Sequence, residues 1–189
     1  RAANLPLFLG SYPITPATSI LEELAALGSV TDGARAEGWA VYLEEAIMNA
    51  GLLDDKPRVR ELIYLFGIFR AARMPADVWL QLNEMTADEV ADYWIERVPY
   101  LDRDVARVDA EIYLRRPPGY GLGYTTGMLQ MQSLLAARQR QLGDAFSLLE
   151  FHDALMAAGR LPIALIHWEM TGDDSGIADL WRRDPLPAP

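Results

Sequence analysis

The sequence predicts an all-α protein, and three observations support this prediction. Apolar residues recur every three or four positions over several long segments, as they do on one face of an amphipathic helix. Most of these segments end at a glycine or a proline, which are common boundaries of helices. No segment of useful length alternates between apolar and polar residues, which is the pattern of a half-buried strand, so we expect no sheet.

The first fifty residues predict two helices after an irregular start. Residues 1–15 contain several prolines and a glycine, which are typical of irregular structure. A helix is expected from Ser19 to Leu27, because its leucines have helical spacing and Gly28 follows them. A longer helix is expected over residues 32–50, closed by Gly51.

The middle of the chain predicts two further helices. The first covers residues 58–74, and Pro75 should end or kink it, because proline lacks a backbone N–H. Residues 77–82 should then continue as helix. Residues 86–89 (Thr-Ala-Asp-Glu) form a capping box, in which the threonine and glutamate side chains bond to free backbone amides at the start of a helix. This helix should reach Arg97.

The remaining sequence predicts four more helices and a tail. The helices are expected over residues 102–115, 123–142, 148–158 and 163–170. Apolar residues of the first of these that should face inward include Val105 and Val108. After Thr171 the sequence becomes polar and ends in a proline-rich segment. We therefore expect one helical domain over residues 1–171, part of a larger domain that continues upstream of residue 1, and a tail over 172–189.

Composition excludes several classes of partner and site. The formal net charge of −10 argues against binding to a nucleic-acid backbone, which requires clustered lysine and arginine. The chain contains no cysteine, so neither a disulfide framework nor a thiolate metal site is possible. No apolar run approaches the roughly 20 residues that cross a bilayer, so a membrane partner is not expected. The chain begins with Arg1, which indicates a processed or truncated polypeptide.

The segment from Glu37 to Glu45 (EGWAVYLEE) lies inside the second predicted helix. Residues three and four apart share a face of a helix, so Glu37, Val41 and Glu44 form one stripe. Gly38 costs about 1 kcal/mol relative to alanine inside a helix. Its presence therefore indicates either close packing of two helices or the close approach of a ligand.

This segment resembles the EGWALYAEE segment of the bacterial domain-of-unknown-function 885 family, which is helical and similar in fold to zinc carboxypeptidases of the Taq type. Three later segments are also similar to the family, in the same order: 70–77 (RAARMPAD) to RAARLVVD, 116–129 to PGQALSYKIGxLK, and 142–162 to LGDKFxxxEFHDAVL…LPL. The resemblance implies a multi-helix array like the C-terminal half of a zinc carboxypeptidase-like fold.

The resemblance also implies a reaction, the metal-assisted hydrolysis of a peptide or amide bond in an intact relative. Glu37 would be the third zinc ligand, after two histidines of an HExxH-type helix. Tyr124 would donate to the negative charge that develops on the substrate oxygen. Glu44 would orient a ligand from behind. The substrate, a peptide or a small molecule, would be contacted by Asp77, Gln81 and Tyr120.

The chain departs from the family pattern where this chemistry would lie. It contains no HExxH sequence, and its two histidines, His152 and His167, fall on different predicted helices. Zinc would have one plausible ligand here, where a catalytic site normally requires three from the protein. We therefore expect zinc only if an HExxH-type helix lies upstream of Arg1. Gln81 stands where the family tends to have a histidine, and Tyr120 stands in place of the family's glutamine.

Three hypotheses for the function stay open. The chain is a fragment or divergent member of a zinc-metallopeptidase-like family, a metal-free relative that binds a peptide or ligand, or a structural domain whose aromatic residues fill helix interfaces. The glycines around Tyr124 are ambiguous in the same way. They fit a bend that admits a ligand backbone, or a helix start in which small residues serve packing.

Overall fold

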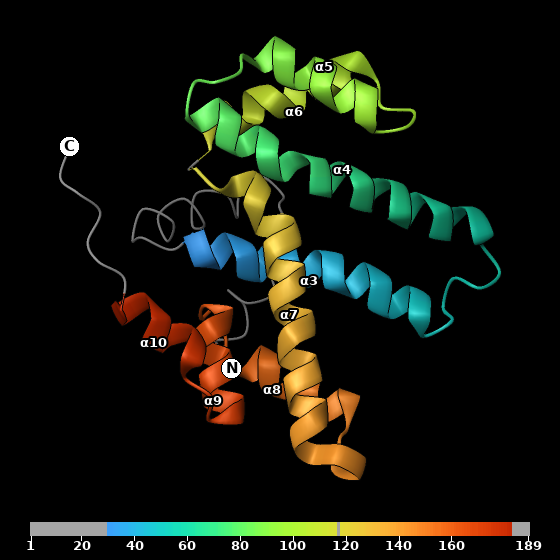
Figure 1. The fold of residues 1–189 in the computed structure, drawn as a ribbon. Coiled ribbons are helices and arrows are strands. Elements are labelled where there is room, and N and C mark those ends of the chain that lie inside the picture. Colours follow the sequence, from blue (N-terminus) through green and yellow to red (C-terminus); the bar gives the residue numbers. More distant parts are fainter. Residues whose placement is uncertain (1–29, 117, 183–189) are drawn as a thin grey trace, which may run out of the picture.

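The computed structural model describes residues 30–116 and 118–182, and every regular element in these ranges is a helix (Figure 1). The predicted all-α class is thus confirmed. The helix predicted at Ser19–Leu27 lies outside the described residues. Among the helices that are described, none combines the length and apolar character that crossing a membrane would require.

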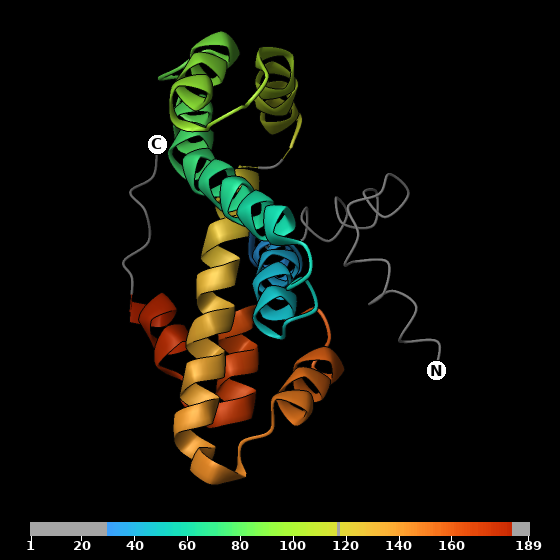
Figure 2. The same cartoon turned by 90° about the vertical axis from the view of Figure 1, so that its right-hand side faces the viewer.

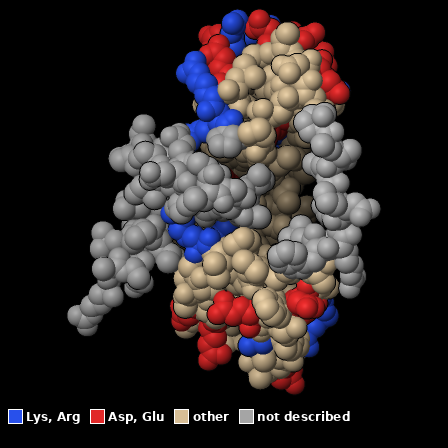
Figure 3. Space-filling view, turned by 90° about the vertical axis from the view of Figure 1, so that its left-hand side faces the viewer, with Lys and Arg blue, Asp and Glu red and all other residues tan. Residues whose placement is uncertain are grey.

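The longest helices form a crossed centre, and the shorter ones pack at its two ends (Figures 1 and 2). In chain order the elements are α3 (Val30–Asn49), α4 (Pro57–Gln81), α5 (Ala87–Arg97), α6 (Arg103–Arg115), α7 (Tyr120–Leu142), the 3-10 turn η1 (Gly143–Ala145), α8 (Leu148–Ala157), α9 (Ile163–Thr171) and α10 (Ser175–Arg182). Helices α5 and α6 lie against α4, whereas α8 and α9 surround the C-terminal half of α7. On one side of the molecule, acidic side chains gather mainly at the two ends, with a hollow between them (Figure 3).

Helices α3 and α7 cross in direct backbone contact at Gly38 and Gly127. A Cβ atom added to Gly127 would lie 1.9 Å from the carbonyl oxygen of Ala34. A Cβ atom added to Gly38 would lie 2.3 Å from the carbonyl carbon of Gly127. Real side chains never approach so closely, so both positions require glycine. Close helix packing therefore explains Gly38, and it also explains one of the glycines around Tyr124.

The buried apolar side chains form two clusters. One lies between α4, α5 and α6, with Trp94 fully buried inside it: Phe69, Ala72, Ala76, Leu80, Val90, Ala91, Trp94, Val98, Ala106, Ala110 and Tyr113. The other joins α3 and α7 to α8 and α9: Tyr42, Met131, Leu134, Phe151, Leu155, Ile163 and Ile166. The crossing of α3 and α7 therefore lies between two cores.

Helix α4 continues through Pro75, so the predicted end of the helix at this residue is wrong, whereas a kink there stays a prediction. The continuation predicted over residues 77–82 is confirmed as far as Gln81. A proline weakens the backbone hydrogen bonds of the turn before it. The indole Nε1 of Trp94 donates to the carbonyl of Ala72 at 3.1 Å, three residues before Pro75. Packing against α5 thus supplies a donor to the turn that the proline disturbs.

Two predicted boundaries differ from the structure. Helix α7 begins at Tyr120 instead of residue 123, directly after Gly119, whose φ of 91° suits a residue without a Cβ atom. Helix α10 lies where the sequence predicted a tail from residue 172. The amide of Ser175 donates to the Asp173 carboxylate at 3.0 Å at the start of α10. The polar residues 172–176 are exposed at the start of this helix.

The inward face of α6 also differs from the prediction. Val105 and Val108 were expected to face inward, but they are 53% and 58% exposed. The buried positions are Ala106, Ala110 and Tyr113. The two alanines let α6 lie close to its neighbours. Side-chain size therefore determines the buried face of α6 more than apolar character does.

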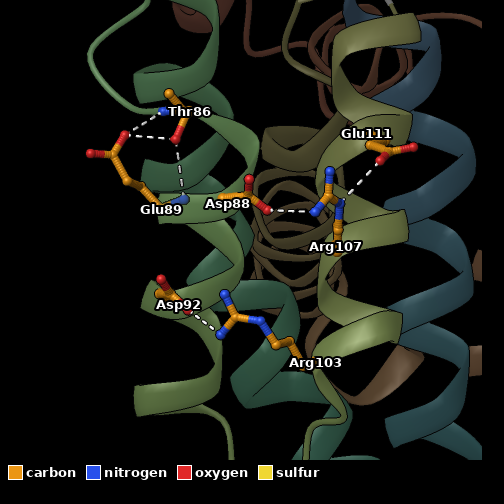
Figure 4. Close-up of polar contacts among 7 residues, drawn as sticks. All are labelled: Thr86, Asp88, Glu89, Asp92, Arg103, Arg107 and Glu111. Atoms are coloured by element: carbon orange, nitrogen blue, oxygen red, sulfur yellow. Dashed lines mark hydrogen bonds and ion pairs between the residues drawn. The ribbon is translucent and has the colours of Figure 1, made fainter.

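The capping box at the start of α5 is confirmed (Figure 4). The amide of Glu89 donates to Thr86 Oγ1 at 3.3 Å, and the amide of Thr86 donates to Glu89 Oε2 at 2.7 Å. Figure 4 also shows two arginines of α6 that reach acidic residues of α5: Arg107 lies 3.0 Å from Asp88, and Arg103 pairs with Asp92. These exposed pairs align α5 with α6.

We expect Thr86→Ala to lower the free energy of unfolding by about 1 kcal/mol, because one free amide of the first turn loses its acceptor. Urea denaturation followed by circular dichroism measures this change. Thr86→Ser keeps the hydroxyl and should remain close to the wild type. Equal stabilities of Thr86→Ala and Thr86→Ser would show that the capping box does not stabilise α5.

Candidate functional site

The crossing of α3 and α7 brings Glu37 to the first turns of α7. Glu37 precedes Gly38, and Tyr124 lies one turn before Gly127, so the two glycines that touch also bring these side chains together. The carboxyl group of Glu37 and the hydroxyl of Tyr124 lie close enough to influence each other's pKa. Two residues that were predicted to act in one site are therefore neighbours.

Glu37 lies in polar surroundings. Burial raises the pKa of its carboxyl group, and the strongest opposing influence is the guanidinium of Arg73. The hydroxyl of Tyr124 and the charges of Arg70 and Arg116 also lower this pKa. The carboxylate is thus half-buried among donors and positive charges, which is unlike the apolar setting that a purely structural role would give it.

Tyr124 and Tyr120 form a pair of phenols on the same face of α7. Their hydroxyl groups lie 2.8 Å apart, and their rings meet edge to face with centroids 5.5 Å apart. Burial, followed by the negative charge of Glu37, raises the pKa of Tyr124. Tyr124 is consequently a neutral phenol that keeps its proton, as a hydrogen-bond donor to a substrate oxygen must.

Arg73 of α4 links these residues to α6. Its Nε donates to Asp109 Oδ2 at 2.9 Å. Its guanidinium lies over two rings, 4.2 Å from the centroid of Phe69 and 5.0 Å from that of Tyr124. The sequence analysis did not identify Asp109 as part of this site. One signal was available in the sequence. Asp109 lies four residues after Val105 and four before Tyr113, on a helix face that was expected to be apolar.

Asp77 and Gln81, which were predicted to contact substrate, bond to the backbone. The buried carboxylate of Asp77 accepts from the amides of Gly121 at 2.8 Å and Leu122 at 3.4 Å, so it caps α7 from α4. Burial raises the pKa of Asp77, and these amides oppose the shift. Gln81 donates to the carbonyl of Tyr113 at 3.2 Å. The bonds of Asp77 hold the start of α7, whereas the bond of Gln81 joins α4 to α6. A substrate role for either residue stays a prediction.

Glu44, predicted to orient a ligand, forms a bidentate pair with Arg70. The two guanidinium nitrogens lie 2.6 and 2.8 Å from its carboxylate oxygens. Its neighbour Glu45 accepts from Gln132 Nε2 at 3.0 Å. Both glutamates therefore connect α3 to other helices, and the link from Glu44 to a ligand stays a prediction.

The two histidines lie apart from this cluster. The Nε2 atom of His152 lies 2.7 Å from the hydroxyl of Tyr42, and the ring packs edge-on against Trp39. Burial lowers the pKa of His152. His167 bonds to Thr171 on its own helix. Both histidines therefore have hydrogen-bond partners within the described residues.

The family is decided by comparison with known sequences. A family model described as "Bacterial protein of unknown function (DUF885)" matches residues 15–170. The chain belongs to this family. No curated protein matches the DUF885 chain. The likeness to zinc carboxypeptidases that the sequence suggested is not among these findings.

A solved structure supports the fold. The DUF885 chain is similar to the crystal structure of the putative lipoprotein from Colwellia psychrerythraea, with 30% sequence identity and a TM-score of 0.69. The similar region covers 74% of this chain and 24% of that protein. The DUF885 chain thus corresponds to about a quarter of the length of that protein.

The donor atoms of the DUF885 chain fit one position of a metal centre. A carboxylate oxygen is an accepted zinc ligand, and Glu37 offers one. Within residues 30–116 and 118–182, no three His, Cys, Asp or Glu side chains come together as a metal site would require. The described residues could therefore hold a metal only together with ligands from elsewhere.

Proposed function

We propose that this DUF885 chain forms one side of a hydrolytic site for peptide or amide bonds, completed by other parts of a longer protein. The observation that supports this proposal is the meeting of Glu37 from α3 with Tyr124 from α7 in a buried polar cluster. A half-buried carboxylate beside a protonated phenol offers a metal ligand and a hydrogen-bond donor side by side. Sequence similarity to the family's EGWA segment adds to this argument.

In this proposal Glu37 would be one ligand of a zinc ion. When bound, zinc would polarise the substrate carbonyl and lower the pKa of a coordinated water. The remaining ligands would come from outside the described residues. Asp77 would contribute indirectly, because its bonds to the amides of Gly121 and Leu122 fix the start of α7.

Tyr124 would stabilise the substrate oxygen as negative charge develops on it. Such stabilisation depends on a donor that is already in position before the reaction. The hydroxyl of Tyr120 lies 2.8 Å from that of Tyr124, and the guanidinium of Arg73 lies over the Tyr124 ring. The Tyr124 hydroxyl donates its single proton to Tyr120. That proton would have to turn from Tyr120 to the substrate oxygen, and Tyr120 could then donate to Tyr124.

A second candidate function is a metal-free binding module for a peptide or small ligand. The positive charges of Arg73, Arg70 and Arg116 all act on Glu37. This environment opposes the binding of a cation and favours a ligand that carries a carboxylate or another anionic group. Gln81 in place of the family's histidine agrees with this alternative.

Metal analysis separates the two candidates. We expect the longest natural form of the protein to contain about one zinc per chain, and Glu37→Gln to lose most of it. Glu45→Gln is the matched control. It removes a carboxylate from the same helix, but this carboxylate bonds to Gln132. An absence of metal from all three proteins would reject the hydrolase and leave the binding module. Zinc that is unaffected by Glu37→Gln would reject Glu37 as a ligand.

A further inference from the structure

Both α4 arginines near Glu37 are paired with other carboxylates. Arg73 bonds to Asp109 of α6, and Arg70 bonds to Glu44 of α3. Among the ion pairs of the described residues, none joins either arginine to Glu37. Glu37 therefore has two positive neighbours, yet neither forms a salt bridge with it.

We propose that Asp109 is a positioning residue, which holds the guanidinium of Arg73 on the ring of Tyr124 and away from Glu37, so that the Glu37 carboxylate remains available to bind a cation or a donor. The use of this carboxylate for a metal rests on the proposed function. The positioning of Arg73 does not rest on it.

The geometry around Arg73 fixes its guanidinium from several sides. Oδ2 of Asp109 lies 2.9 Å from both Nε and Nη2 of Arg73. The rings of Phe69 and Tyr124 lie over the guanidinium. The side chains of Arg73 and Asp109 are only 14% and 17% exposed. A pair this well shielded from water is held far more firmly than an exposed ion pair.

The loss of Asp109 would change the partner of Arg73. A buried guanidinium without a carboxylate is costly, so Arg73 would turn to the next carboxylate within reach. Arg73 is already the largest favourable influence on the charged form of Glu37. The charged or titratable groups around them are Glu37 of α3, Arg70 and Asp77 of α4, Asp109 and Tyr113 of α6, Tyr120 and Tyr124 of α7, and Arg116. Apart from Asp109, the carboxylates among them are Glu37 and Asp77. Asp77 already accepts from the amides of Gly121 and Leu122, so we expect Arg73 to turn to Glu37.

The neighbouring pair repeats the arrangement. Glu44 lies two helical turns after Glu37 on the same stripe of α3, and it holds Arg70 in two hydrogen bonds. Each arginine of α4 that faces this stripe is thus bound by a carboxylate other than Glu37. This repetition favours a specific arrangement of charges over an incidental ion pair.

Removing the two partners of the Arg73–Asp109 pair separately tests the inference. The probe is the reaction of carboxyl groups with a water-soluble carbodiimide and glycine ethyl ester in metal-free protein, measured for Glu37 by peptide mass spectrometry. We expect Asp109→Asn to lower the labelling of Glu37 several-fold, because the released arginine pairs with it. Arg73→Gln should leave this labelling unchanged or increase it. Asp92→Asn, which frees Arg103 on the surface, is the control and should have no effect.

A merely structural ion pair predicts a different pattern, because either substitution would loosen the site and increase the labelling of Glu37. An unchanged or increased labelling in Asp109→Asn would overturn the inference. If Asp109→Asn does not fold, the double variant Asp109→Asn with Arg73→Gln tests the inference instead. It has no released guanidinium, so we expect it to fold. An unfolded double variant would also overturn the inference. Because no metal is present, the result stands whether or not the longer protein binds zinc.

Discussion

The substitution Gly127→Ala is expected to lower the free energy of unfolding by about 3 kcal/mol or more, which is the upper range for overpacking a close contact. The added methyl group would lie 1.9 Å from the carbonyl oxygen of Ala34 and 2.8 Å from the Cα atom of Gly38. Both obstacles are backbone atoms, which cannot rotate away. Helices α3 and α7 would have to separate. The gain of roughly 1 kcal/mol from better helix propensity is too small to compensate.

Gly67→Ala provides a matched control with the opposite sign. Gly67 also lies inside a long helix, but a Cβ atom there would meet nothing within 4 Å. This variant should gain up to about 1 kcal/mol from helix propensity. Urea denaturation of both variants measures the difference. A Gly127→Ala protein as stable as the wild type would show that the two helices do not cross as closely as described.

The same substitution should also affect the candidate site. Tyr124 lies one turn before Gly127, and Glu37 lies directly before Gly38. Any separation of α3 from α7 therefore moves the carboxylate away from the phenol. If the site binds zinc, Gly127→Ala should lower the zinc content even where the protein remains folded, whereas Gly67→Ala should not.

The sequence contained enough information to predict most helix boundaries. Gly51, with a φ of 82°, follows α3 as expected, and the capping bonds at Thr86 start α5. These signals succeed because they act within a few residues of the chain. Gly38 was also informative, since a glycine inside a helix has a cost that only a close neighbour explains. The neighbour itself, Gly127, could not be identified without the fold.

Features that depend on distant partners were missed. Helix α4 continues through Pro75. The turn before this proline accepts a hydrogen bond from Trp94, which lies in the next helix, α5. The buried face of α6 is set by Ala106 and Ala110, whose small size admits close neighbours. Asp109 is part of the candidate site only because α4 brings Arg73 to it. Glu37 and Tyr124 were found through resemblance to a family, whereas local patterns alone would not have paired them.

The substitution Trp94→Ala is expected to lower the free energy of unfolding by about 3 to 5 kcal/mol. Trp94 is fully buried in the core between α4, α5 and α6. Its ring packs edge-on against Phe69 and Tyr113, with centroids 5.3 and 5.6 Å apart, and its Nε1 donates to Ala72. Removing the ring leaves a large cavity that these neighbours cannot fill. The surface residue Trp168, which is 51% exposed, should tolerate alanine with a loss below about 1 kcal/mol.

Trp94→Phe separates the hydrogen bond from the packing. A phenyl ring keeps most of the apolar contacts but has no donor for the carbonyl of Ala72, so we expect a loss of about 1 to 2 kcal/mol. Circular dichroism in urea is the suitable measurement, because each variant removes a tryptophan and changes the fluorescence. If Trp94→Phe matched the wild type, the indole bond would not support α4 at Pro75. If it matched Trp94→Ala, the indole hydrogen bond would be the main contribution of Trp94 to stability. Helix α4 would then depend on this donor to continue past Pro75 to Asp77, which bonds to the start of α7.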